Sequence, residues 1–292
     1  MARGKQSARK ESPRIPRGVW WGIGLLLVVG AGLGAGSVHG RARQILARAP
    51  VGVAVDWPVA PGQKETWLAP TFRERITGDI EALLAGRPLD HAALARVGAA
   101  LERGGWFVSR PSVRRDGDGV VRVLGEWRTP TCVIRHEGRD YASDWTGRLL
   151  PVVYVEGVTS MRFVEGVSSG PATDAHGEID YAQPWPGDDV QAGLTLLRPL
   201  CRESFAPQVR GVNVGQFYRL SRMSIVTDRG TEVVWGGRYE EFIPGEASTE
   251  EKLARLRHLA SRTDVAGRID AGLERLELFD EHGLVIDLTR RP

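Results

Sequence analysis

Residues 166–170, Gly-Val-Ser-Ser-Gly, fit the G-x-S-x-G pattern of the nucleophile elbow in α/β-hydrolases. In that elbow a strand turns sharply into a helix and lifts the serine beside an oxyanion hole. Here Pro171 and other residues typical of loops follow the motif, and the chain lacks the alternating strand and helix units of such a sheet. The residues that follow the motif therefore argue against Ser168 as a nucleophile. An exported serine hydrolase stays as the less favoured alternative.

Other residues that could do chemistry are dispersed. The six histidines stand singly, Cys132 and Cys201 have no metal-ligand spacing, and a disulfide between them is left open. The Asp-Gly-Asp-Gly run at 116–119 lacks the further ligands of a calcium loop and predicts a turn. No Walker loop, His-Glu-x-x-His or Cys-x-x-Cys motif occurs. We therefore predict a non-enzymatic protein without metal or cofactor.

Pairs of carboxylates could serve acid–base chemistry only if they faced one another across a site. Three pairs are instead adjacent in the chain, and we interpret them as solvated turns and helix starts: Asp188/Asp189, Glu240/Glu241 and Glu250/Glu251.

The net charge of +3 over 292 residues is unevenly distributed. Residues 1–18 carry six basic residues and a single acidic one, Glu11, so the rest of the chain is slightly acidic. A nucleic-acid-binding body is not supported, because the basic character belongs to this tail.

An apolar segment follows the tail. Residues 19–40 contain no Asp, Glu, Lys or Arg, and at about 1.5 Å per residue they would cross the roughly 30 Å hydrocarbon core of a bilayer. The basic excess before the segment predicts a cytoplasmic N-terminus and a single-pass type II protein, with 41–50 as a linker. A signal peptide cleaved near residues 35–37 is the alternative. Either way, the bulk of the chain is expected outside the cytoplasm.

Residues 51–127 predict the order β-α-α-β-β. Asp90 is the expected N-cap of the second helix, and Gly104-Gly105 its end. The predicted elements are a strand at 51–57, helices at 71–86 and 89–105, and strands at 106–115 and 120–127.

From residue 128 the pattern is mostly that of strands. Three short runs are separated by the turns Glu137-Gly138 and Thr146-Gly147, and residues 165–189 predict a long loop. A helix over 190–204, interrupted by Pro199, and a hairpin turning at 228–230 follow.

The last part of the chain predicts a helix and a final hairpin. Ser248 and Glu251 form a capping box, and Leu253, Leu256 and Leu259 give the helix one apolar side. The closing hairpin is expected at 276–288. The predicted fold class is thus α+β: a transmembrane helix, the β-α-α-β-β region, and a mainly antiparallel β domain (128–292) with a covering helix.

Taken in order, these features resemble the FtsQ/DivIB family of bacterial cell-division proteins. Three stretches carry the resemblance: Glu126, Arg128 and Pro130 after the second strand pair; Asp144 and Gly147 in a D-x-x-G turn; and Gly236, Lys252, Leu253 and Leu256 near the last helix. The chain departs from the family at Glu126–Pro130, which is one residue longer, at the 116–119 turn, and at Glu277-Leu278-Phe279. The 165–189 loop looks like an addition.

The resemblance implies that 51–127 is a POTRA domain and that the protein is a scaffold at the division septum of the inner membrane. It implies FtsB- and FtsL-like bitopic partners and a link to septal peptidoglycan synthesis. Partners would add a strand to the last hairpin, whose candidate binding residues are Leu276, Leu278, Phe279, His282, Leu284, Ile286 and Leu288. The alternative for these leucines is packing in the core of the β domain. The alternative for the protein is another envelope assembly or secretion scaffold with a POTRA-like domain.

Overall fold

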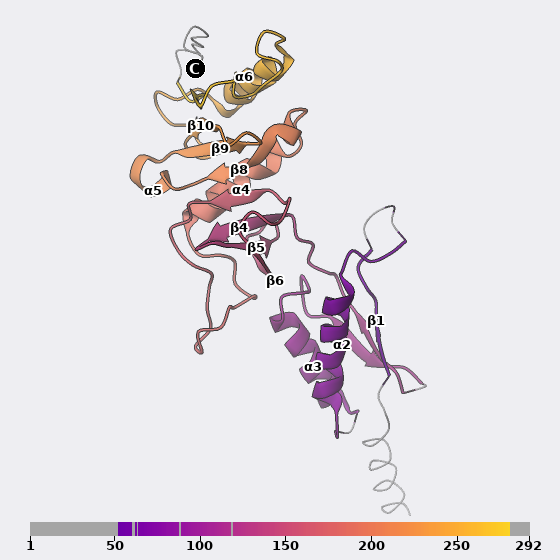
Figure 1. The fold of residues 1–292 in the computed structure, drawn as a ribbon. Helices are drawn as coiled ribbons and strands as arrows, with labels where there is room; N and C mark the ends of the chain where they lie inside the picture. Colours follow the sequence, from indigo (N-terminus) through magenta and orange to yellow (C-terminus); the bar gives the residue numbers. More distant parts are fainter. Residues whose placement is uncertain (1–51, 60–61, 63, 88, 118, 281–292) are drawn as a thin grey trace, which may run out of the picture.

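The computed structural model describes residues 52–280, except 60–61, 63, 88 and 118. The predicted tail, span and linker, and the predicted hairpin beyond residue 280, lie outside this range. Within it, no helix has the length and apolarity needed to cross a bilayer. The described chain is a mixed α+β structure built from two sheets, each with helices packed on it (Figure 1).

Residues 52–127, the N-terminal module, follow the predicted β-α-α-β-β order. The three-stranded sheet has the order β1-β3-β2, with β1 parallel and β2 antiparallel to β3. Asp90 caps α3 as predicted, because its carboxylate accepts a hydrogen bond from the Ala93 amide at 2.8 Å. The elements are β1 (Val53–Val55), α2 (Pro70–Leu84), α3 (His91–Arg103), β2 (Ser112–Arg115) and β3 (Val121–Leu124).

Residues 128–280, the C-terminal module, form an eight-stranded sheet in the order β11-β10-β9-β8-β7-β4-β5-β6. Its strands are β4 (Cys132–His136), β5 (Arg139–Ser143), β6 (Leu149–Val155), β7 (Phe163–Glu165), β8 (Val209–Asn213), β9 (Met223–Thr227), β10 (Glu232–Gly236) and β11 (Arg275–Glu277). Its helices are α4 (Asp188–Leu200), the 3-10 turn η1 (Ala206–Gln208), α5 (Phe217–Leu220) and α6 (Thr249–Ser261).

Four of the seven strand pairs in the large sheet are antiparallel, as predicted for most of the sheet, but the sheet is mixed. Three of its pairs are parallel: β4 with β7, β7 with β8, and β10 with β11. For two of these pairs the reason is a helical crossover, since α4 connects β7 to β8 and α6 connects β10 to β11, and such a connection returns the chain in the same direction. The chain reaches β7 from β4 through β5 and β6, without a helix. Strand β11 therefore enters the sheet alongside β10 and not as the first arm of a hairpin on β10.

Two apolar cores hold these modules. Helices α4 and α6 cover one face of the large sheet, and Trp185, Trp235 and Phe205 are among the side chains buried there. The second core lies between α2, α3 and the small sheet. It also includes Ala142, Leu150 and Val152 of β5 and β6, so the two modules share apolar packing at their junction.

Candidate functional site

The predicted partner edge is described as far as Asp280. Leu276 and Leu278 are buried in the core under α6, which was the alternative for these leucines. Phe279 is half-buried, and the Arg222 guanidinium lies 4.3 Å from the centre of its ring. His282, Leu284, Ile286 and Leu288 lie outside the described residues.

The backbone of β11 is open on its outer side. The Leu278 amide donates to the Val234 carbonyl at 2.9 Å, and hydrogen bonds in a parallel pair alternate along the strand. Leu276 and Leu278 therefore bond β10, whereas the N–H and C=O groups of Arg275 and Glu277 point away from it. Among the described residues these outward groups have no partner.

The segment just after β11 is held on both sides. The Phe279 carbonyl accepts a hydrogen bond from the Ala247 amide at 2.8 Å. Arg255 on α6 donates to the carbonyls of Leu278 and Asp280 at 2.8 and 2.6 Å. The open stretch is thus short, and α6 fixes its position.

A buried ion pair supports the same end of the sheet. Lys252 Nζ lies 2.7 Å from Glu246 Oε2, and the Gly237 amide donates to the same oxygen at 3.0 Å. Lys252 also stands 5.2 Å from the centre of the Trp235 ring. Gly236 has a φ of +97°, and a Cβ there would lie 2.4 Å from Glu246 Oε2, so this close approach requires glycine.

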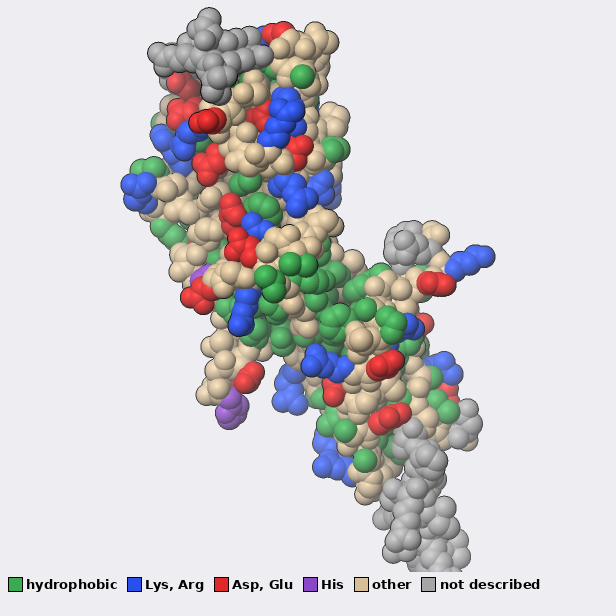
Figure 2. Space-filling model, viewed as in Figure 1, with side chains coloured by type: hydrophobic (Ala, Val, Ile, Leu, Met, Phe, Trp, Pro, Cys, Tyr) green, Lys and Arg blue, Asp and Glu red, His purple; other side chains and the backbone are tan. Residues whose placement is uncertain are grey.

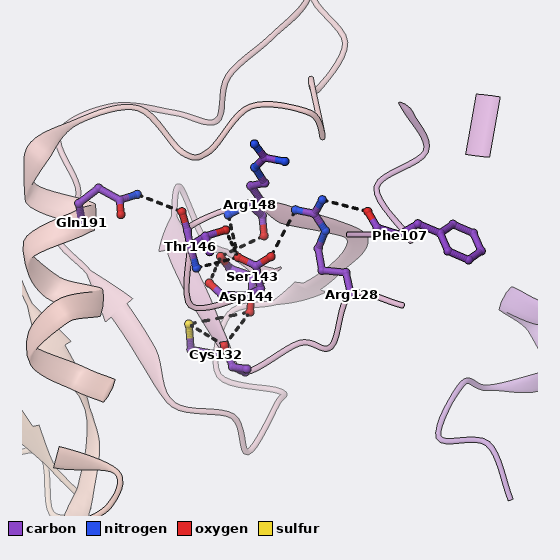
Figure 3. Close-up of polar contacts among 9 residues, drawn as sticks. Phe107, Arg128, Cys132, Ser143, Asp144, Thr146, Arg148 and Gln191 are labelled. Carbon is purple, nitrogen blue, oxygen red and sulfur yellow. Dashed lines mark hydrogen bonds and ion pairs between the residues drawn. The ribbon is translucent and has the colours of Figure 1, made fainter. Parts of the chain in front are cut away.

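Two residues that carry the family resemblance meet at the junction of the modules (Figure 3). Arg128, 3% exposed, places Nη1 3.3 Å from Asp144 Oδ2 and donates through Nη2 to the Phe107 carbonyl at 3.1 Å. Asp144 Oδ1 accepts from the Thr146 amide and hydroxyl at 2.8 and 2.6 Å. Burial lowers the pKa of the Arg128 guanidinium, and the Asp144 charge opposes this. The pair ties the turn after β5 to the N-terminal module.

Ser168 lies in a loop, as predicted, because no helix follows it before α4 begins at Asp188. Its amide donates to Asp189 Oδ2 at 2.7 Å. The interpretation of Asp189 as solvated was wrong. Its side chain is 1% exposed and also accepts a hydrogen bond from the Val190 amide in the first turn of α4, so the buried carboxylate joins the loop at Ser168 to the start of the helix. Asp188 is exposed and pairs with Arg238 at 2.9 Å.

Neither cysteine belongs to a group of potential metal ligands among the described residues. Both cysteines are free thiols, and burial raises the pKa of Cys132 to about 12 and raises that of Cys201. Over the described range, no three His, Cys, Asp or Glu side chains are grouped so that they could hold a metal ion.

The sequence showed Lys252, Arg128 and Asp144 only as motif positions, and nothing in it indicated that Lys252 and Arg128 are buried beside the carboxylates with which they pair.

A scan against models of protein families finds no match for this chain, and a search of curated proteins finds no matching relative.

Proposed function

We propose that this protein is a non-enzymatic scaffold of the bacterial cell-division machinery, and that it binds a partner by strand addition at the outer edge of β11. The observation that carries the proposal is the set of outward N–H and C=O groups on Arg275 and Glu277, at the end of a sheet whose neighbouring leucines are buried. Main-chain hydrogen bonds would supply the affinity of such a contact.

The finer assignment of the N-terminal module is to a POTRA domain. The β-α-α-β-β order, the β1-β3-β2 sheet and the two helices packed on it support this assignment. With residues 19–40 as an inner-membrane anchor and 1–18 in the cytoplasm, the module would stand next to the bilayer. In Figure 1, β11 and α6 belong to the end of the molecule farthest from β1, so a partner would meet the edge away from the anchor.

The partners that fit this arrangement are FtsB- and FtsL-like bitopic proteins, which would present an extended segment outside the cytoplasm and connect it to septal peptidoglycan synthesis. The side chains of β11 that flank the open groups are charged: Arg275 and Glu277 are both more than half exposed. A partner strand that offers opposite charges in register would be favoured there.

The test uses a substitution that blocks the edge without removing a bond to β10. Glu277→Pro deletes an outward N–H, and edge strands tolerate proline at such positions. Glu277→Asp is the matched control, because it keeps both the charge and the donor. We expect full-length Glu277→Pro to lose at least about tenfold in co-purification of small bitopic partners from detergent, whereas Glu277→Asp keeps most of it.

Two outcomes would contradict the proposal. Undiminished co-purification by a folded Glu277→Pro protein would remove β11 as the site. A fluorescent fusion spread evenly around the envelope, without enrichment at midcell, would remove the division role and favour another envelope scaffold. Loss of complementation by a folded Ser168→Ala variant would instead support the serine hydrolase.

A further inference from the structure

Strand β6 forms the opposite edge of the large sheet, and its outward backbone groups are also open. The Glu156 amide donates to the Gly138 carbonyl at 3.0 Å, which fixes the alternation of hydrogen bonds along β5 and β6. Val153 and Val155 therefore point their N–H and C=O groups away from β5. The Val155 carbonyl accepts from Val158. Across the described chain, the two groups of Val153 and the N–H of Val155 have no partner.

The side chains at this edge are apolar and exposed. Val153, Val155 and Val158 are 43%, 71% and 72% exposed, whereas soluble proteins usually place charges on such strands. The long loop pairs with the residues just before β6, where the Trp185 amide donates to the Gly147 carbonyl at 2.8 Å and Pro184 forms a bridge with Arg148. From Pro151 to Val155 the edge has no strand beside it.

A groove of about 610 Å³ adjoins the same edge. One wall consists of apolar side chains of the N-terminal module: Ile76, Ile80, Leu83, Ala100, Leu101 and Trp106. The other wall includes Pro151 of β6 and Tyr181 of the long loop. The Tyr181 side chain packs directly on the backbone of Gly105, where a Cβ would lie 2.7 Å from it. Figure 2 shows hydrophobic side chains gathered in the middle of the molecule, where the two modules meet.

We propose that β6 is a second strand-addition site, and that its occupant is a single extended segment of a partner protein with apolar residues at alternate positions. The open donors and acceptor of Val153 and Val155 would pair with its backbone, and its apolar side chains on one face would enter the groove. The groove is lined by α2, α3, Pro151 and Tyr181, and this apolar lining favours an occupant with apolar side chains. Pro151 has no N–H, which limits donation by the edge to Val153 and Val155.

The probe is a fluorescein-labelled ten-residue peptide of alternating valine and threonine with a lysine at each end, titrated with the full-length chain in detergent. The control peptide carries an N-methyl group on every valine and threonine amide, so that neither of its edges can donate a hydrogen bond to β6. Val153→Pro deletes an outward donor, and Val153→Thr is the matched variant that keeps it. We expect saturable binding by anisotropy, at least about tenfold weaker with Val153→Pro and within about threefold of wild type with Val153→Thr.

Glu277→Pro should leave this binding unchanged, because it blocks the other edge of the sheet. This variant separates the two proposals, since partner co-purification should respond to Glu277→Pro and peptide binding to Val153→Pro. The proposal is overturned if the probe does not bind at about 1 mM, if the N-methylated peptide binds equally well, or if Glu277→Pro alone weakens binding.

Hydrogen exchange of the wild-type protein gives a second measurement that needs no folded Val153→Pro variant. The peptide should slow exchange at the amides of Val153 and Val155. Unchanged exchange in this strand under saturating peptide would also overturn the proposal.

Discussion

Lys252 offers a direct test of how the C-terminal end of the sheet is held. Its side chain is 4% exposed, and that of its partner Glu246 is 12% exposed, at a separation of 2.7 Å. Lys252→Met keeps a long side chain next to Trp235 but leaves the Glu246 carboxylate with the Gly237 amide as its remaining donor. Removal of one partner from a buried ion pair costs about 3–5 kcal/mol. In a module of this size, that corresponds to a fall in Tm of about 6–20 °C.

A double-mutant cycle measured by urea unfolding isolates the pair. Glu246→Gln should destabilise by a similar amount, because it leaves the Lys252 ammonium buried without a counter-charge. The double variant should lose less than the sum of the two, with a coupling free energy of about 1–3 kcal/mol.

Arg257→Met is the matched control on the same helix. Arg257 is 53% exposed and pairs with Glu203 at the surface, so its loss should cost no more than about 1 kcal/mol. A Lys252→Met loss no larger than this control, or a coupling free energy near zero, would refute the assignment of the pair as a support for β10 and α6.

Two further predictions concern the buried arginines Arg268 and Arg128. Arg268 bonds Asp228 and the buried Asp270, each at 2.6 Å. The hydrogen bond from Arg268 holds the pKa of Asp228 below its usual range; burial raises the pKa of Asp270, but bonds from Arg268 and Gly272 lower it overall. The stability that the ion pairs of Arg268 with these two carboxylates contribute is present above the unfolded carboxyl pKa of about 3.9. It is lost as the pH falls through the lower pKa values of the folded state. The deficit of Arg268→Leu in urea unfolding should therefore be largest at neutral pH and shrink in acid; a constant deficit would contradict this. Arg128→Met should destabilise by about 3 kcal/mol and broaden or split the calorimetric transition, because it unties the two modules; a single, equally sharp transition would count against that role.

Local signals in the sequence predicted the elements that depend on neighbouring residues. The turn at Glu137-Gly138 has φ values of +47° and +74°, as a tight hairpin requires, and it joins β4 to β5 as expected. The Ser248–Glu251 capping box forms with both of its hydrogen bonds, and α6 begins at Thr249, directly after the N-cap Ser248. These elements follow from turn and cap chemistry within a few residues.

The rest depends on contacts between segments far apart in the chain. Strand β7 has three residues and no periodicity to reveal it; parallel neighbours on both sides define it. The partners of Arg128 include Phe107, which lies in the other module. Charge pairs of this kind are set by tertiary packing, so a sequence shows the charged residue without showing its burial.

The two open edges of the large sheet differ in the partner strand that each would favour. Strand β11 has the charged side chains of Arg275 and Glu277 at its open groups, which disfavour pairing with an arbitrary strand and would favour a partner of matching charge. Strand β6 has exposed valines beside an apolar groove. On the proposals above, one edge would select its partner by charge and the other by apolar contact. Because the sheet between them is continuous and Arg128 ties its β6 end to the N-terminal module, partners at the two edges would be held at a fixed separation, which is the mechanical requirement of a scaffold.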